Sequence, residues 1–166
     1  MRVLLAYPYF LYDRAHEENV DALPIGMPFV AAALREAGHE VELADWHDAD
    51  QAATRVPADL DRFRPDVLAF SIFHANRWGA LDAAEFAKQR LPDVATVLGG
   101  IGATFLDELL LTHFPQVDYV LRGEGEAAFP ALLAALEAGP DGLEDRLGRV
   151  PGLSWRGPDG VTANEA

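Results

Sequence analysis

Short apolar runs alternate along the chain with stretches in which apolar residues recur at helical spacing. The runs predict five strands, at Val3–Ala6, Glu40–Ala44, Val67–Phe70, Val94–Leu98 and Val117–Leu121. The stretches between and after them predict helices at Pro28–Ala37, Asp59–Phe63 (the end of a weaker helix), Arg77–Leu91, Thr104–His113 and Ala127–Ala138. Such alternation is typical of βαβ units and a parallel sheet.

Five strands joined by helical crossovers fit a doubly wound α/β fold of the flavodoxin-like (Rossmann-like) kind. Crossovers are right-handed almost without exception, so we expect a five-stranded parallel sheet in the order 2-1-3-4-5. Ligands of such sheets bind at the carboxyl ends of the strands. We therefore expect a crevice between the loops that start at Tyr7, Ser71, Gly99 and Arg122.

Two segments lie outside this alternation. The connection from Tyr7 to about Pro24 is rich in aromatic and charged residues, and long loops in compact domains are usually lids or disordered. Near the end, residues 152–163 predict a β-hairpin, because Asp159-Gly160 has strong turn chemistry. We expect an α/β domain over 1–150 and a hairpin or linker over 151–166.

Composition narrows the possible functions. The net charge of −14 argues against a general nucleic-acid binder and against attraction to anionic lipid. The chain has no cysteine, which excludes a Cys nucleophile or a Cys-ligated iron–sulfur cluster within it. No apolar run approaches the ~20 residues of a membrane span. We expect a cytoplasmic protein without nucleic-acid or membrane partners.

Several familiar sites do not match. A dinucleotide fold needs G-x-G-x-x-G after the first strand, where this chain has Tyr7-Pro8-Tyr9-Phe10. A phospho-receiver domain needs an Asp at the end of the third strand, where Ser71 stands. No G-x-S-x-G elbow is present. The histidines have no metal-ligand spacing, so no metal ligand is expected among them: His16, His39, His47, His74 and His113.

Small or polar residues follow three predicted strands in turn. The segments are Ser71-Ile72-Phe73, Gly99-Gly100-Ile101-Gly102 and Arg122-Gly123-Glu124-Gly125-Glu126. Glycine lets a bulky ligand approach the backbone, because no Cβ stands in the way. By itself, the Gly99–Gly102 stretch is either a phosphate cradle or a tight strand-to-helix turn.

Together with Pro24-Ile25-Gly26, Gly38-His39-Glu40-Val41, Arg64-Pro65-Asp66 and the final hairpin, these segments form an ordered set. The whole chain resembles the N-terminal cobalamin-binding domain of cobalamin-dependent radical S-adenosylmethionine enzymes. Members of the wider cobalamin family carry Asp-x-His-x-x-Gly, then Ser-x-Leu, then Gly-Gly. Here Ser71-Ile72-Phe73 and Gly99-Gly100 match the last two, while Gly26 stands in the place of the metal-ligating His.

The resemblance implies cobalamin bound base-off, with no histidine below the cobalt. It implies that Gly99, Gly100 and Gly102 clear a slot for the detached nucleotide tail, that Ser71 bonds the tail, and that Tyr7 and Pro8 pack near the corrin. Asn76 is expected to bind corrin amides. Glu124 and Glu126 either cap the following helix or contact the ligand. The remaining positions of the expected cofactor site are Pro24, Gly26, Phe73, Gly123 and Gly125.

The same resemblance places the iron–sulfur cluster and S-adenosylmethionine in a barrel domain that this chain lacks, with methyl transfer as the expected reaction. The chain is then not catalytic by itself. Two alternatives stay open at this point. One is a stand-alone module that binds a different nucleotide-like ligand. The other is the N-terminal half of a glycosyltransferase-like enzyme, which also has a Gly-His-Glu-Val segment.

Overall fold

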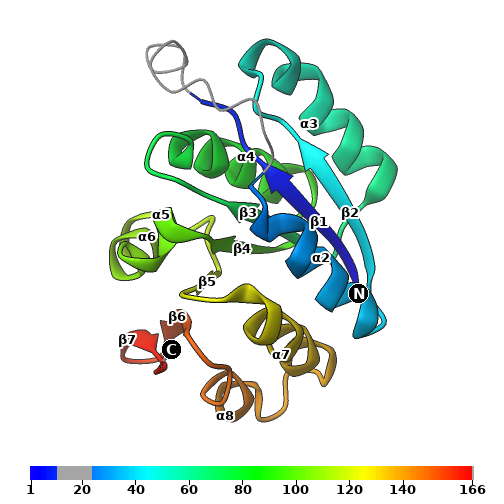
Figure 1. Ribbon diagram of the computed structural model, residues 1–166. Helices are drawn as coiled ribbons and strands as arrows, with labels where there is room; N and C mark the ends of the chain where they lie inside the picture. Colours follow the sequence, from blue (N-terminus) through cyan, green and yellow to red (C-terminus); the bar gives the residue numbers. More distant parts are fainter. Residues whose placement is uncertain (11–23, 166) are drawn as a thin grey trace.

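The computed structural model describes residues 1–10 and 24–165, and it shows one twisted sheet with helices on both faces (Figure 1). In this part of the chain the strand order is β2-β1-β3-β4-β5-β6-β7. The first five strands run parallel, in the predicted order. The strands are β1 Arg2–Tyr7, β2 Glu40–Asp45, β3 Val67–Ser71, β4 Ala95–Gly99, β5 Tyr119–Leu121, β6 Leu153–Gly157 and β7 Gly160–Ala163.

The helices of the described residues follow the predicted crossovers, with one addition near the end of the chain. They are α2 Gly26–Glu36, α3 Ala49–Phe63, α4 Arg77–Arg90, α5 Ile101–Thr104, α6 Asp107–His113, α7 Gly125–Glu137 and α8 Leu143–Leu147. None of these helices is long and apolar enough to span a membrane. Residues 11–23 belong to the long connection for which the sequence predicts a lid or a disordered loop. They lie outside the described residues.

The hairpin is a correction to the sequence-based picture. The expected sheet has five strands, but β6 pairs antiparallel with β5, so the hairpin extends the same sheet to seven strands, with Tyr119 opposite Trp155. Leu153 and Trp155 are buried against the helices on one face. Strand β5 has only three residues, and an unpaired edge there would expose its backbone groups. The hairpin covers that edge.

Two helix boundaries also differ from the prediction. The helix expected over Thr104–His113 is split into α5 and α6, and at the break the Leu106 amide donates to Ala103 O, three residues back. The weak helix ending at Phe63 begins as early as Ala49, after Asp48 caps it by accepting from the amides of Asp50 and Gln51. Its alanine-rich first half gives little apolar periodicity.

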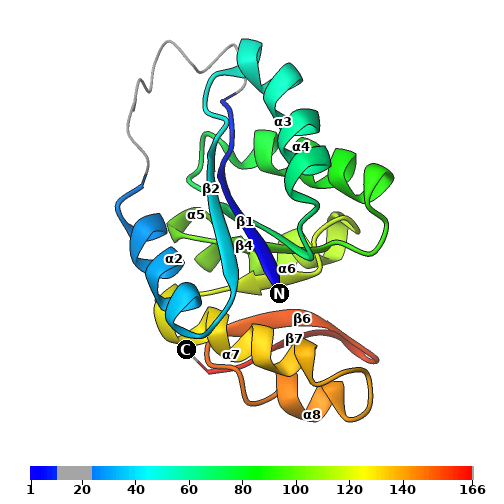
Figure 2. The same ribbon diagram turned by 90° about the vertical axis from the view of Figure 1, so that its right-hand side faces the viewer.

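Alternating side chains divide the core into two layers. In β1, Val3, Leu5 and Tyr7 face helices α2, α7 and α8. Leu4 and Ala6 face α3, α4 and α6 on the other side of the sheet. Figure 2 shows α2 and α3 on opposite sides of β1 and β2.

Gly79, buried in the first turn of α4, lets the segment after β1 lie directly on that helix. A Cβ at this position would come within 2.2 Å of Tyr9 O. One turn further, Asp82 lies 3.5 Å from the Tyr9 hydroxyl, and burial together with this carboxylate raises the pKa of Tyr9 to about 12. Tyr9 therefore packs on the α3 and α4 face of the sheet.

Candidate functional site

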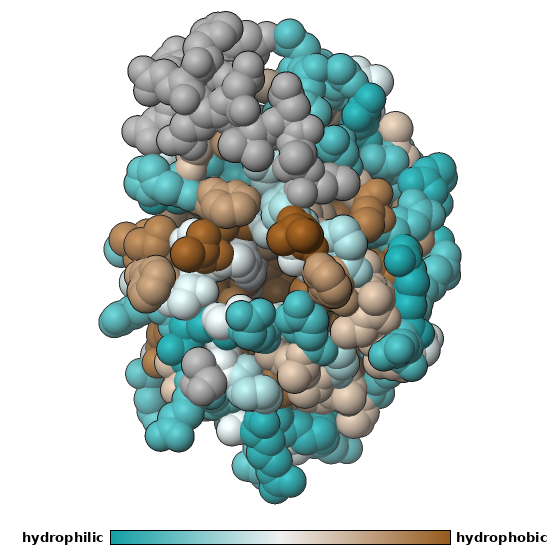
Figure 3. All heavy atoms as spheres, in the orientation of Figure 1, coloured by the Kyte–Doolittle hydropathy of each residue, from teal (hydrophilic) through white to brown (hydrophobic). Residues whose placement is uncertain are grey.

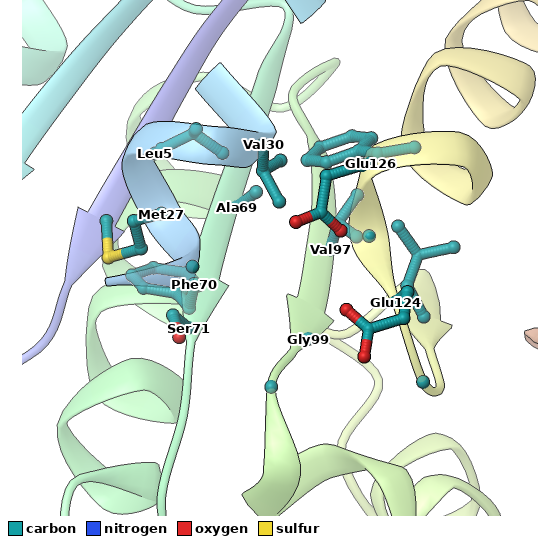
Figure 4. Close-up of a pocket in the computed structure, with 16 residues that line it drawn as sticks. Leu5, Met27, Val30, Ala69, Phe70, Ser71, Val97, Gly99, Glu124 and Glu126 are labelled. Atoms are coloured by element: carbon teal, nitrogen blue, oxygen red, sulfur yellow. The ribbon is translucent and has the colours of Figure 1, made fainter. Parts of the chain in front are cut away.

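A cavity of about 210 Å³ lies between α2 and α7, over the carboxyl-terminal halves of the parallel strands. Its floor is apolar, because Leu5, Ala69 and Val97 are paired neighbours of β1, β3 and β4 whose side chains face the same way. Val30 lines the cavity from α2 (Figure 4). Phe129 lines it from α7. Met27 and Leu121 complete the apolar lining.

The opening of the cavity is made by the loops that the sequence singled out. Ser71 and Gly99 are paired at the ends of β3 and β4, two residues beyond the floor and on the same face. The residues of the expected site that line the cavity are Gly26, Ser71, Gly99, Gly100, Gly123, Glu124, Gly125 and Glu126. Three strand ends and the start of two helices thus meet at one opening.

Most of these glycines have a reason within the protein itself. Gly100 and Gly123 have φ of +87° and +73°, a backbone conformation that side chains with a Cβ rarely adopt. A Cβ on Gly125 would lie 3.0 Å from Val30 Cγ2.

Gly26 and Gly99 differ from the other glycines of the opening. A Cβ on Gly26 would meet nothing within 4 Å, and one on Gly99 only backbone oxygens, the nearer at 3.8 Å. Neither has a positive φ. Both positions are left open although the protein does not need them open, which points to a ligand.

Gly102 is the exception among the expected slot residues. It does not line the cavity, and a Cβ there would lie 2.7 Å from Ile72 O and from Phe73 C. The Gly102 amide donates to Ile72 O at 2.9 Å. Gly102 thus lets α5 pack on the loop after β3, so its space is filled by the chain itself.

The two glutamates at the start of α7 do not cap the helix. Glu124 occupies the N-cap position without a side-chain cap hydrogen bond. Within the described residues, neither the Glu124 nor the Glu126 carboxylate has a hydrogen bond or an ion pair. Figure 4 shows both carboxylates turned toward the cavity. Side-chain capping is thus not formed, while the position of Glu126 in the first turn of α7 suits the helix dipole, and contact with a ligand stays a prediction.

The other expected residues gather beside the cavity rather than in its lining. Tyr7 is buried, and its ring meets Phe73 edge-on at 6.5 Å between centroids. Phe73 is 41% exposed, and its amide donates to Asn76 Oδ1 at 2.7 Å. Asn76 is fully buried, and its Nδ2 has no hydrogen-bond partner among the described residues. Pro8 is buried and follows β1 directly, and Pro24 is half-buried and lies just before α2.

Sequence reasoning missed the helical side of the cavity. Met27, Val30 and Phe129 occupy ordinary apolar positions of α2 and α7, and core packing alone accounts for apolar residues at that spacing. The signal that was available is weak: Phe29 and Val30 both lie on the helix that follows Gly26. Only the tertiary arrangement shows which apolar side chain faces the opening.

Large apolar side chains remain exposed on the segments that flank the opening. Ile25 and Phe29 at α2 are 80% and 60% exposed, and Ile101 and Phe105 at α5 are 65% and 80% exposed. Figure 3 shows hydrophobic residues around a hollow on this side of the molecule. Exposed apolar groups gathered near a cavity mark a binding surface.

No metal site is formed in the described part of the chain. No group of three or more His, Asp or Glu side chains there is close enough to hold an ion. His47 Nδ1 lies 2.7 Å from Asp45 Oδ1, and His74 Nδ1 lies 3.0 Å from the Arg77 guanidinium, so both rings have local partners. The expectation about His16 lies outside the described residues.

Known proteins are similar to this chain in sequence and in fold. The chain is 41% identical over 144 residues to the hopanoid C-3 methylase of Methylococcus capsulatus, covering 85% of this chain and 27% of that protein. It is 36% identical over 147 residues to the cobalamin-dependent radical SAM methyltransferase TokK of Streptomyces tokunonensis, covering 84% and 21%. The chain thus spans about a quarter of the length of these relatives.

A solved structure shows the same fold at low sequence identity. The cobalamin-dependent S-adenosylmethionine radical enzyme OxsB, with aqua-cobalamin and S-adenosylmethionine bound, superposes with a TM-score of 0.78 at 20% identity. The match covers 99% of this chain and 22% of that one. The B12 binding domain family matches residues 16–133. The resemblance found in the sequence is confirmed, and the chain belongs to the B12 binding domain family.

Proposed function

We propose that this chain is the cobalamin-binding part of a radical S-adenosylmethionine enzyme, with methyl transfer as the reaction of the whole. The observation that carries this proposal is the apolar cavity at the carboxyl ends of the strands, with Gly26 and Gly99 left open toward it. The relatives support the reaction class, because two of them are named as a methylase and as a cobalamin-dependent radical SAM methyltransferase.

The residues of the site fit the detached tail of a corrinoid. The apolar floor and walls suit a flat aromatic base, and the open Gly99 leaves room above them. At the opening, Ser71 offers a hydroxyl and the first turn of α7 offers backbone N–H groups to a phosphate or ribose. Glu124 and Glu126 accept hydrogen bonds from hydroxyl or amide groups.

The segments beside the cavity would face the corrin ring. Phe73, which is 41% exposed, supplies apolar surface there, and the buried Tyr7 ring supports it edge-on. The buried Asn76 side chain accepts from the Phe73 amide and so holds this segment in place. No histidine lines the cavity among the described residues, and Gly26 stands where the family's ligating His is expected. We therefore propose base-off binding without a histidine below the metal. When bound, cobalamin supplies a cobalt atom that carries a methyl group.

The rest of the reaction needs residues that this chain does not have. A radical S-adenosylmethionine cluster is held by cysteine thiolates, and the chain contains none. The cluster and S-adenosylmethionine would come from a further domain, and the exposed apolar side chains around the opening are available to contact it. The net charge of −14 supports the further proposal that the protein acts in the cytoplasm and binds neither nucleic acid nor an anionic membrane.

Titration of the purified chain with hydroxocobalamin tests the proposal. We expect about one equivalent bound, with the absorption spectrum of a base-off corrinoid. Flavin mononucleotide and ATP, added in parallel, separate this function from a module for another nucleotide-like ligand. Binding of either nucleotide with no binding of cobalamin at high micromolar concentration would overturn the proposal. A base-on spectrum at saturation would overturn the base-off part alone.

A further inference from the structure

The polar groups of the cavity are confined to its opening. Among the lining residues, the polar side chains are Ser71, Glu124 and Glu126, all at strand ends or at the start of α7. The deep part is formed by aliphatic and aromatic side chains, including Leu5, Ala69 and Val97. The backbone beneath them is committed to the sheet, since Leu5 pairs with Ala69 and Ala69 pairs with Val97. A group that enters the deep part therefore meets no free donor or acceptor.

This distribution separates the aromatic bases that a corrinoid tail can carry. A dimethylbenzimidazole presents methyl groups and ring carbons to the deep part of the cavity. These groups form no hydrogen bonds with water, so their burial breaks none. An adenine presents ring nitrogens and an exocyclic amine, and each gives up water without finding a partner. The size fits a two-ring base, because an apolar cavity of about 150 Å³ holds a single benzene and this one has about 210 Å³.

We infer that this cavity selects corrinoids by the tail base, favouring benzimidazole over purine. The inference rests on the proposed function and adds the class of corrinoid that the site takes. Val97 is the residue through which the selection can be altered, since it forms part of the floor beside Ala69 and is 1% exposed. The acceptors at the opening, such as the Glu126 carboxylate, work against the selection, because they can accept a hydrogen bond from an amine there.

The test compares three ligands on the same protein: cobalamin, the corresponding corrinoid with an adenine base, and cobinamide, which has no base. Dissociation constants are measured from the corrinoid spectrum. We expect the adenine form to bind about tenfold or more weaker than cobalamin, the effect of leaving one buried polar group without a partner. We expect cobinamide to bind weaker than cobalamin as well, because it leaves the cavity unfilled.

Two matched variants sharpen the result. Val97→Thr keeps the shape of the floor and adds a hydroxyl, so the ratio between the adenine form and cobalamin should fall. Val94→Thr makes the same change at a buried position on the other face of the sheet, and the ratio should stay that of the wild type. Glu126→Gln identifies any contribution of the carboxylate to binding of the adenine form.

Equal affinities of the wild-type chain for cobalamin and the adenine form would overturn the inference and leave the proposed function intact. Equal affinities for cobalamin and cobinamide would also overturn it, because the tail would then not be bound. If the affinity ratio between the adenine form and cobalamin falls in Val94→Thr as much as in Val97→Thr, the floor of the cavity does not discriminate between the bases. Loss of binding to all three corrinoids in the wild type would instead contradict the proposed function.

Discussion

The two edges of the parallel sheet are built in opposite ways. At the amino ends of the strands, polar groups are paired with one another. Asp118 accepts from Lys88 Nζ at 2.5 Å, from the Thr96 amide at 2.8 Å and from Thr96 Oγ1 at 3.0 Å. The amide of Arg2 donates to Asp66 at 2.7 Å, and the N-terminal amine donates to Glu137 at 2.7 Å. Each of these groups has its partner within the described residues.

At the carboxyl ends, groups are left unpaired or uncovered. In the described part of the chain, Gly26 and Gly99 have room for a Cβ, Asn76 Nδ2 has no hydrogen-bond partner, and the carboxylates of Glu124 and Glu126 face a cavity. The difference between the edges agrees with the cofactor site proposed at the carboxyl ends.

The largest effect on stability is expected at the paired edge. Replacing Asp118 with Ala leaves the Thr96 amide and the Lys88 ammonium without their acceptor, and Thr96 is fully buried. We expect the free energy of unfolding to fall by about 2–3 kcal/mol in urea titrations. Cobalamin affinity at low denaturant should not change. A loss below about 1 kcal/mol would show that the network contributes little.

The next effect is expected where the segment after β1 rests on α4. In Gly79→Ala the new Cβ would lie 2.2 Å from Tyr9 O, a backbone atom that cannot move by side-chain rotation. The strain outweighs the helix propensity gained, and we expect a loss of about 1–2 kcal/mol in thermal or urea unfolding. Gly148→Ala is the control, since its φ is −60° and its nearest neighbour would be at 3.4 Å. Equal stabilities of the two variants would refute the close approach.

The smallest effect is expected for Glu137. Its hydrogen bond with the N-terminal amine of Met1 holds the pKa of this carboxyl below its ordinary value of 4.5. Because the folded-state pKa is the lower one, the stabilisation is fully present above pH 4.5 and is lost as the pH falls through the lowered pKa.

Urea unfolding of Glu137→Gln and of the wild type between pH 7 and pH 3 measures this contribution. The difference at pH 7 should stay below about 1 kcal/mol, since the side chain is 45% exposed. It should shrink toward pH 3. A difference that grows as the pH falls has the wrong sign for this pair.

The order of the parallel strands could be predicted because each strand is a short apolar run followed by a helical crossover, and the handedness of crossovers leaves few arrangements. The place of the hairpin could not, because whether β6 pairs with β5 depends on how much of that edge is exposed after folding. Likewise, Gly99 and Gly102 are three residues apart, and the sequence predicts for both that they clear a slot for the nucleotide tail. Only the positions of Ile72 and Phe73 show that the second glycine serves packing.

The dissociation constant of cobalamin for Gly99→Leu, measured beside Gly148→Leu, tests the open cavity itself. Gly99 has ordinary backbone angles and room for a side chain, so leucine there should fill the cavity without unfolding the sheet. Gly148 receives the same side chain at an exposed position. We expect cobalamin to bind Gly99→Leu about tenfold or more weaker than Gly148→Leu at equal thermal stability. Equal affinity in the two folded variants would mean that the tail of the cofactor does not occupy this cavity.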